Sequence, residues 1–142
     1  MSVGRICVRE VFLARPDESA EAAAQRMVKE GVGTLVVLDG NGRPIGILTD
    51  RDLMARCVAE GAQPAATPVH AVMSAPAALV RETTPIEEAL SRMVSLRVRR
   101  LPVIDAEDRL SGILALDDVL ELLAEEMAAV GRVVQRSRGR SA

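Results

Sequence analysis

The heptapeptide "GILTDRD" at residues 46–52 returns 66 positions later as "GILALDD" at residues 112–118. The second copy keeps the glycine, the Ile-Leu pair and the final aspartate, but it has Ala115 in the place of Thr49. A strand that ends tightly and a helix that begins with an acid explain the shared residues, because glycine tolerates close packing and acids favour the first turn of a helix. These two heptapeptides therefore indicate a duplicated unit.

The duplication reaches well beyond the heptapeptides. Residues 17–54 align with residues 83–120 without a gap, and 14 of the 38 aligned positions are identical. Unrelated segments of this length would share only a few residues, so the chain contains an internal repeat, which decides the architecture. The identical pairs include Arg26/Arg92, Met27/Met93, Val28/Val94, Asp39/Asp105 and Arg43/Arg109.

Each copy is expected to contain a short extended segment, a helix, two strands and a second helix. In the second copy, Thr84 is expected to cap the first helix, with Pro85 in the first helical position and Glu87 completing a capping box. Helical spacing and short apolar runs joined by polar turns predict the other elements. The extended segments are expected around 11–14 and 78–80, the first helices over 18–30 and 84–97, the strands over 34–39, 44–48, 100–105 and 109–114, and the second helices over 50–60 and about 116–130.

The stretch "GAQPAATP" at residues 61–68 is rich in Gly and Pro and is expected to link the two copies. The first repeat then covers residues 1–66 and the second covers residues 67–142, with an extended C-terminal helix and a basic tail. One unit of about 60 residues cannot bury its sheet and both helices alone. We therefore predict a mixed α+β fold with the copies face to face about a pseudo-two-fold axis, and a ligand cleft between equivalent loops.

Composition limits the partners of the chain. Its formal net charge of -2 offers no overall field for nucleic acid or a membrane. The apolar runs are short and broken by charges, and residues 1–15 lack the apolar core of a signal peptide. Phe12 is the only aromatic residue, which argues against stacking on single-stranded nucleic acid. Cys7 and Cys57 are too few for a disulfide framework, so we expect a cytoplasmic protein that binds neither nucleic acid nor membranes.

The sequence offers no catalytic constellation. His70 is the only histidine, and no set of Cys and His residues has the spacing of metal ligands. The stretch "GNGRPIG" at residues 40–46 contains glycines, but it is interpreted as a hairpin turn rather than as a phosphate-binding loop between a strand and a helix. We therefore expect neither an enzyme nor a metal site.

The repeat, the order of elements and the motif Gly-apolar-apolar-Thr-x-x-Asp together resemble a tandem CBS-domain protein, also called a Bateman module. The segments "VGTLVVLDGNGRPIGILTDRD" (32–52) and "VRRLPVID" (98–105) are similar to such domains. The resemblance covers essentially the whole chain. It implies a regulatory module that binds AMP, ADP, ATP or S-adenosylmethionine in clefts between paired domains, with no required cofactor.

The resemblance also implies roles for particular residues. Asp52 would hold the ribose hydroxyls, and Thr49 would contact phosphate or ribose. Arg99 and Arg100, just before a strand of the other copy, would contact phosphate, and Gly46 would let the backbone approach the ligand. These residue types suit the chemistry, because a carboxylate accepts hydrogen bonds from two cis hydroxyls and a guanidinium matches phosphate oxygens.

The two clefts implied by the resemblance are unequal. The first cleft combines Thr49 and Asp52 with both arginines and so has every implied contact. The second would combine Asp118 and Ala115 with Gly33 and Thr34, which stand in the places of the two arginines. This cleft lacks the hydroxyl and both cations, and Asp117 adds a negative charge beside any phosphate. We therefore expect one working nucleotide site and a second site that is weak or empty.

The same residues also have a structural interpretation. Thr49 and Asp52 fit a variant capping box at the start of a helix, and Asp118 is favourable in a first helical turn with or without a ligand. Arg99 and Arg100 could be charges on a solvated strand edge. The alternative function is therefore a ligand-free structural or oligomerisation module with a vestigial nucleotide site.

A sensor of this kind would act in trans on a partner protein or through its own assembly. The resemblance implies a homodimer, and we expect it to form through the helices over 50–60 and 116–130. The tail over residues 131–140 is expected to be a frayed, solubilising terminus. Apolar residues form a stripe along one face of the predicted last helix, namely Val119, Leu120, Leu123, Met127 and Val130.

Overall fold

The computed structural model describes residues 1–140, which form two three-stranded sheets with the same topology. The strand orders are β1-β2-β3 and β4-β5-β6. In each sheet the first two strands run parallel and the last two run antiparallel. The strands are β1 (Leu13–Ala14), β2 (Thr34–Leu38), β3 (Pro44–Thr49), β4 (Val80–Arg81), β5 (Arg100–Ile104) and β6 (Leu110–Ala115).

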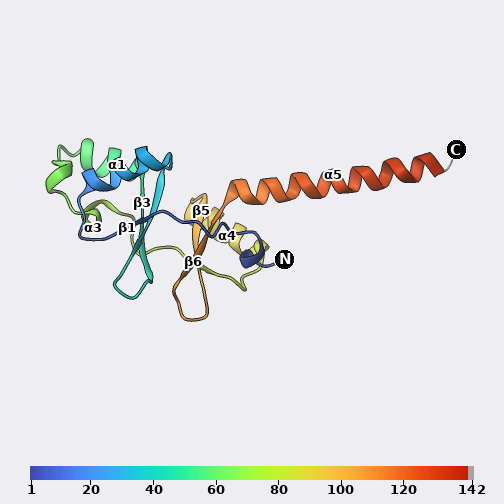
Figure 1. Ribbon diagram of the computed structural model, residues 1–142, viewed down its shortest axis with the longest axis horizontal. Helices are drawn as coiled ribbons and strands as arrows, with labels where there is room; N and C mark the ends of the chain where they lie inside the picture. Colours follow the sequence, from blue (N-terminus) through green and yellow to red (C-terminus); the bar gives the residue numbers. More distant parts are fainter. Residues whose placement is uncertain (141–142) are drawn as a thin grey trace.

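Helices cover both sheets, so the mixed α+β fold and the predicted order of elements are confirmed (Figure 1). Short 3-10 turns at Val3–Arg5 and Pro64–Ala66 add to them. The helices are α1 (Ala20–Glu30), α2 (Asp50–Leu53), α3 (Val69–Val72), α4 (Ile86–Leu96) and α5 (Leu116–Arg140).

Three details of the helices differ from the sequence prediction. The helix expected over 50–60 is α2 followed by a π-helical turn at Met54–Val58. The expected cap at Thr84 is wrong, because Pro85 has extended backbone angles and is itself the N-cap, while Thr84 Oγ1 accepts a hydrogen bond from Arg81 N (3.0 Å). The tail is not frayed, since α5 continues to Arg140.

Each copy has its own apolar core between sheet and helices. Leu35 pairs with Leu48 in the first sheet, and Leu101 pairs with Leu114 in the second, and all four side chains are fully buried. In β3 and β6, Leu48 and Leu114 alternate with half-buried neighbours, as the period of two along a strand requires. Strands β2 and β5 instead carry consecutive buried residues. Equivalent helix residues close the two cores, namely Ala23 and Met27 in α1 and Ala89 and Met93 in α4.

The two copies exchange their first segments. Residues 69–74 pack on the first sheet, where Ser74 exchanges two backbone hydrogen bonds with Ile47. Residues 3–8 pack on the second sheet, where Val8 makes the same pair of bonds with Ile113. The period of 66 residues relates these two segments, so each copy is completed by a segment next to the other copy. The boundary at residues 66 and 67 follows the sequence repeat and stays a prediction.

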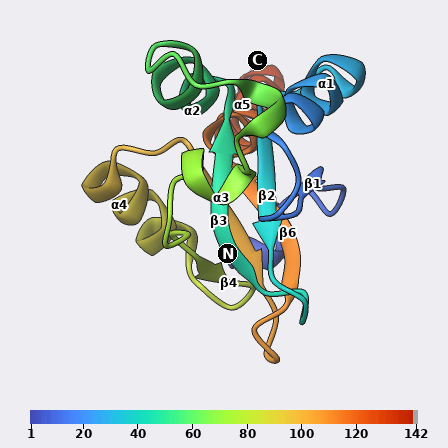
Figure 2. The same cartoon turned by 90° about the vertical axis from the view of Figure 1, so that its left-hand side faces the viewer.

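The arrangement places equivalent ends together. The hairpin turns of both sheets meet at one end, where Leu110 N donates to Gly42 O (3.0 Å). From these turns β3 and β6 run to the opposite end, where α2 and α5 begin (Figure 2). Helix α5 then leaves the body, and its C-terminal half lies far from both sheets (Figure 1).

Candidate functional site

The predicted site begins where β3 ends. Thr49 is the last residue of β3 and the N-cap of α2. Its backbone N–H donates to Asp52 Oδ2 (3.0 Å), and the backbone N–H of Asp52 donates to Thr49 Oγ1 (3.1 Å). This reciprocal pair is a capping box, so the structural interpretation of both residues is confirmed. Asp52 is only 8% exposed and is the one buried charged residue among residues 1–140.

Two residues that the sequence analysis missed surround the other oxygen of Asp52. Ser74 Oγ donates to Asp52 Oδ1 (3.1 Å), and Arg56 Nη1 lies 3.7 Å from the same oxygen. Arg56 also donates to the carbonyl oxygens of Val72 (3.1 Å) and Met73 (2.8 Å), and so ties the exchanged segment to the helix. The four-residue spacing of Asp52 and Arg56 is a sequence signal for that pair. Ser74 gave no such signal, because it reaches the site through pairing with β3.

The carboxylate of Asp52 keeps the capacity to accept further hydrogen bonds. An ionised carboxylate offers about four acceptor positions. Thr49 N–H and Ser74 O–H each occupy one of them. The remaining positions suit neighbouring hydroxyl donors such as those of a ribose.

The equivalent end of β6 has a simpler geometry. Asp118 Oδ2 accepts a hydrogen bond from Ala115 N (3.0 Å), as Asp52 does from Thr49. Ala115 has no hydroxyl, so the second bond of the capping box is missing. Asp118 therefore still binds the backbone N–H at the start of α5, although no threonine is present there.

The two predicted phosphate contacts lie beside the end of β6. Arg100 begins β5 and faces Ala115 in the strand ladder, and Arg99 O accepts a hydrogen bond from Leu116 N (2.9 Å). Arg99 Nη2 lies 3.7 Å from Asp117 Oδ1, and both of these side chains are largely exposed. Within residues 1–140, no hydrogen bond or ion pair joins Arg99 or Arg100 to Thr49 or to Asp52.

These two groups nevertheless occupy the same end of the molecule. Strands β3 and β6 both end on the side where α2 and α5 begin, opposite the hairpin turns (Figures 1 and 2). In the first copy the place of Arg99 is taken by Gly33, whose missing Cβ would lie 2.9 Å from Asp50 Oδ2. The exposed arginines of the second copy and the buried Asp52 of the first copy therefore lie toward the same end of the body (Figure 2).

Gly46 is required by packing within the protein. A Cβ at Gly46 would come within 2.6 Å of Met73 Sδ and 3.1 Å of Ser74 O. A Cβ at Gly112 would come within 2.7 Å of Val8 O. Both glycines therefore make room for the exchanged segments, which explains why both copies keep them. The predicted approach of a ligand to Gly46 stays a prediction.

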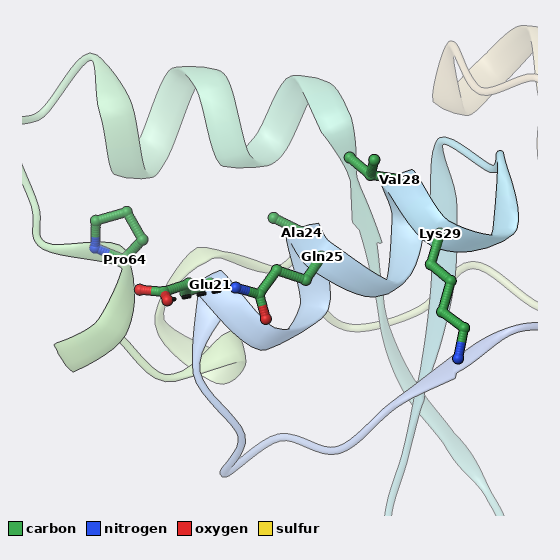
Figure 3. Close-up of a pocket in the computed structure, with 6 residues that line it drawn as sticks. All are labelled: Glu21, Ala24, Gln25, Val28, Lys29 and Pro64. Carbon is green, nitrogen blue, oxygen red and sulfur yellow. Dashed lines mark hydrogen bonds between the residues drawn. The ribbon is translucent and has the colours of Figure 1, made fainter.

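Three surface hollows lie away from these residues. The first, of about 500 Å³, is an open apolar surface between α1 and the turn at Pro64–Ala66, and it includes Val28 and Lys29 (Figure 3). The second, of about 590 Å³, lies between the hairpin turns and includes Arg43 and Arg109. The third is lined by residues of α4 and β4, among them Arg92 and Arg81. None of these three hollows is lined by Thr49, Asp52, Arg99 or Arg100, so all three lie apart from the predicted nucleotide site.

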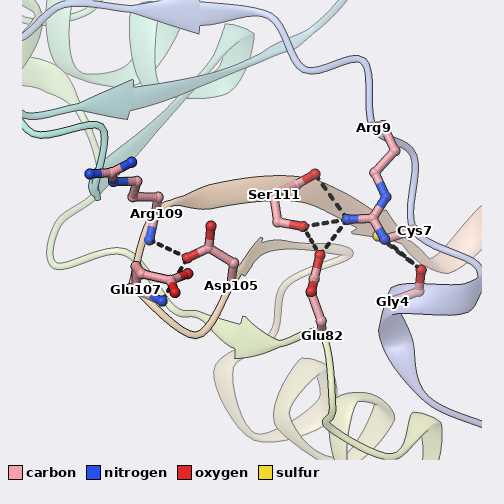
Figure 4. Close-up of polar contacts among 8 residues, drawn as sticks. All are labelled: Gly4, Cys7, Arg9, Glu82, Asp105, Glu107, Arg109 and Ser111. Atoms are coloured by element: carbon pink, nitrogen blue, oxygen red, sulfur yellow. Dashed lines mark hydrogen bonds and ion pairs between the residues drawn. The ribbon is translucent and has the colours of Figure 1, made fainter.

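A polar cluster fixes the N-terminal segment to the second sheet (Figure 4). Arg9 Nη1 donates to Glu82 Oε1 (2.6 Å) and contacts Ser111 Oγ, while Arg9 Nη2 donates to Gly4 O (2.8 Å). Hydrogen bonds from Ser111 and Arg9 hold the pKa of Glu82 below its usual value. Burial raises the pKa of the neighbouring Cys7 thiol, which indicates a packing role rather than a reactive one.

Residues 1–140 contain neither a cluster of metal-ligating side chains nor a membrane-spanning helix. Among residues 1–140, no three His, Cys, Asp or Glu side chains are arranged to hold a metal ion. In the same range, no helix combines the length and the apolar character needed to cross a membrane. Both free cysteines lie in packed surroundings, Cys57 fully and Cys7 in part.

Comparison with known proteins identifies the fold. The CBS domain family matches residues 3–59 and 69–125. The protein belongs to the CBS domain family. The uncharacterised protein MK0525 of Methanopyrus kandleri is 35% identical to this CBS protein over 122 residues, which are 86% of this chain and 62% of that protein. Inosine-5'-monophosphate dehydrogenase of Methanocaldococcus jannaschii is 32% identical, but the match covers only 22% of that enzyme, so the likeness is to its CBS portion.

Solved CBS structures share the architecture. Hypoxic Response Protein I with two coordinated zinc ions has a TM-score of 0.78 at 30% identity, over 85% of this chain and 98% of that one. CBSX2 in complex with AMP has a TM-score of 0.76 at 26% identity, over 89% and 98%. A hexameric CBS-CP12 protein from bloom-forming cyanobacteria has a TM-score of 0.75 at 26% identity, over 84% and 66%. CBS pairs are regulatory modules, and this chain contains one such pair.

Proposed function

We propose that this CBS pair is a sensor that binds an adenine nucleotide between its two copies and signals in trans to an effector protein. The proposal is supported by the position of the Thr49 and Asp52 pair of the first copy and the two exposed arginines of the second, which lie toward the same end of the body (Figure 2). The AMP complex of CBSX2 supports the class of ligand. The composition, with two free cysteines, suits the cytoplasm.

The chemistry divides between the two halves of the ligand. The free acceptor positions on Asp52 would take the ribose hydroxyls, and Thr49 Oγ1 would contact ribose or phosphate. Arg99 and Arg100 would bind phosphate oxygens, because a guanidinium stays charged and offers a planar pair of donors. The second site lacks the threonine and both arginines and would bind weakly or not at all.

The ribose contact is tested by calorimetric titration with AMP, ADP, ATP and S-adenosylmethionine. We expect Asp52→Ala to abolish nucleotide binding, and 2'-deoxy-AMP to bind at least about tenfold more weakly than AMP, because a buried acceptor loses its donor. Asp118→Ala is the matched control, since it removes the same contact to the backbone in the other copy. Unchanged affinity in a folded Asp52→Ala protein would sink the assignment.

The phosphate contact is tested with substitutions that leave the fold alone. Arg99→Ala with Arg100→Ala changes two exposed side chains. This variant should bind AMP much more weakly than the wild type and should bind adenosine as the wild type does. Equal loss for AMP and adenosine would show that the arginines do not contact phosphate.

A ligand-free structural module is the second candidate, and the capping box favours it. Thr49 and Asp52 satisfy one another, so their presence needs no nucleotide. The chain has no Trp and no Tyr, so any adenine that copurifies would dominate its near-ultraviolet spectrum. A flat spectrum, together with no thermal shift across adenine nucleotides, would select this candidate.

We also propose that the protein is a homodimer formed through its outer helical faces. Exposed apolar residues recur at equivalent positions of the two copies, Val28 (84% exposed) with Val94 (79%), and Met54 (58%) with Leu120 (53%). Surfaces of this kind mark interaction sites. Light scattering after size exclusion should give a dimer that Val94→Glu weakens and that the neighbouring exposed control Ser95→Glu leaves intact. A monomeric wild type would reject the dimer.

A further inference from the structure

Helix α5 carries an unburied apolar stripe along its whole projecting length. Of its 25 residues, only Val119 is buried. The stripe residues recur at alternating intervals of three and four, which is the seam of a two-helix coiled coil. They are Leu120, Leu123, Met127, Val130 and Val134, and each is between 45% and 71% exposed. The seam lies on a helix about 37 Å long, and most of this helix projects away from the body (Figure 1).

The charges of α5 are strictly separated along its length. Residues 116–126 carry five acids and no base, and residues 127–140 carry four arginines and no acid. The helix dipole favours such charges only in the terminal turns. It therefore explains Asp117, Asp118 and Arg140, but it does not explain the acids at 121, 125 and 126 or the arginine at 132.

The projecting part of α5 is not well suited to standing alone. Gly131 and Gly139 lie inside it, and each costs about 1 kcal/mol relative to alanine. Glu121 and Glu125 are like charges four positions apart, as are Arg132 and Arg136, and such pairs destabilise a helix. Most helices gain their stability from packing of the apolar face. Only the first turns of α5 pack on the described body of its own chain, through the buried Val119 and the half-buried Leu116 and Leu122.

We propose that α5 pairs with α5 of a second copy in an antiparallel two-helix coiled coil, with Met127 opposite Val130 of that copy. This register places Leu123 opposite Val134 and brings every seam residue from 123 to 134 into contact with an apolar partner. It also sets the acidic half of each helix against the basic half of the other. In this register, three pairs of opposite charge lie at the same height along the axis of the helix pair. They are Asp117 with Arg140, Glu121 with Arg136, and Glu125 with Arg132.

Charge selects the second copy and the antiparallel direction. A parallel pair would place the acidic half of each helix beside the acidic half of the other and arginines beside arginines, with the helix axes about 8–10 Å apart, which is close to the Debye length of about 8 Å at physiological salt. A two-fold axis near Ala128 and Ala129 gives both helices the same apolar and charge contacts, as a symmetric dimer requires. Because α5 projects from the body (Figure 1), the antiparallel pair holds the two bodies at opposite ends of the paired helices, so it is a self-association surface separate from the outer helical faces of the proposed homodimer. It does not depend on nucleotide binding.

The seam is tested in the full chain with one substitution and one control. Met127→Glu places a charge in the centre of the seam and should weaken self-association at least about tenfold. Ala128→Glu adds the same charge outside the seam and should leave association within about twofold. Both variants should bind nucleotide as the wild type does. A dimer that survives Met127→Glu but is lost in Val94→Glu would overturn the α5 pair and leave the proposed homodimer standing.

The direction is tested by spin-label distances in a Cys7→Ser, Cys57→Ala background. In the antiparallel register, labels at Ala129→Cys are offset by about 1.5 Å along the axis, and labels at Gln135→Cys by about 20 Å. The distance between the two labels should therefore be short at 129 and long at 135. Equal distances at both sites would show a parallel pair, and the absence of dipolar coupling at 129 would show an unpaired helix; either result overturns the proposal.

Discussion

Thr49 and Asp52 bind each other twice, while their counterparts Ala115 and Asp118 bind each other once. The shared bond runs from the backbone N–H of residue 49 or 115 to the carboxylate, at 3.0 Å in both copies. The additional bond runs from Asp52 N to Thr49 Oγ1 at 3.1 Å. The repeat thus contains its own comparison of a helix start with and without a capping hydroxyl.

Ala115→Thr should therefore stabilise the protein. The new hydroxyl would accept from the N–H of Asp118 and complete the capping box, a change of about 0.5–1 kcal/mol in the free energy of unfolding. Thr49→Ala should lower the same quantity by a similar amount. Urea denaturation gives both values. Ala115→Val is the matched control, because it adds a branched side chain without the acceptor, and equal effects of Thr and Val would contradict the capping explanation.

The exchanged segments lead to a second prediction, at the two repeated glycines. A Cβ at Gly46 would lie 2.6 Å from Sδ of the flexible Met73 side chain and 3.1 Å from the backbone oxygen of Ser74, whereas a Cβ at Gly112 would lie only 2.7 Å from the backbone oxygen of Val8. A backbone atom yields less than a methionine, so Gly112→Ala should cost about 1–3 kcal/mol and Gly46→Ala should cost less. Thermal or urea unfolding measures the order.

Gly40→Ala is the control for this pair, because a Cβ there meets nothing within 4 Å and its φ is not positive. Its effect on the free energy of unfolding should be small. If Gly46→Ala proved as costly as Gly112→Ala, the difference between the two contacts would not govern the packing.

The fold could be predicted from the sequence because a duplicated pattern gives two readings of each element. Strands such as β2 and β5 carry buried residues at matched positions, so an ambiguous run in one copy was supported by its partner. The turn at Met54–Val58 could not be predicted in this way, because the second copy continues as regular helix. The cap at Thr84 failed because its threonine forms a turn with Arg81 instead.

The candidate site was only partly accessible to sequence reasoning. The end of β3 was found because Thr49 and Asp52 lie close together in the chain. Ser74 was missed because it is 22 residues from Asp52 and reaches it only through the exchanged segment. Long-range placement of this kind depends on strand pairing, which the local pattern of residues 72–74 does not reveal.

Arg56 provides a third prediction, since it connects the acid of the site to that segment. Its guanidinium donates to Val72 O and Met73 O and lies 3.7 Å from Asp52 Oδ1. Arg56→Met keeps the aliphatic stem and removes the donors, and should lower the free energy of unfolding by about 1–2 kcal/mol. Hydrogen exchange at Ser74 N, which donates to Ile47 O, should accelerate. Unchanged exchange would show that strand pairing alone holds the segment.

Glu18 provides a prediction for acid conditions. It is a largely buried carboxylate that accepts hydrogen bonds from Arg26 Nη2 (2.7 Å) and Arg15 N (2.7 Å). Burial raises the pKa of Glu18, but the bonds from Arg26 and Arg15 outweigh it, so the pKa in the folded protein lies below its usual value of 4.5. The folded state therefore favours the charged form more than the unfolded state does.

The sign of this effect fixes the pH range in which Glu18 contributes. A depressed pKa gives stability that is complete above about 4.5, the unfolded value, and that is lost as the pH falls through the lower folded value. Glu18→Gln should thus be less stable than the wild type at pH 7, by about 1–3 kcal/mol, and the difference should shrink below pH 4.5. In an Arg26→Met background the cost of Glu18→Gln at pH 7 should be clearly smaller, because the pair is already broken. A difference that stays constant from pH 7 to pH 3 would show that the Glu18 side chain stabilises the fold by shape and not by charge.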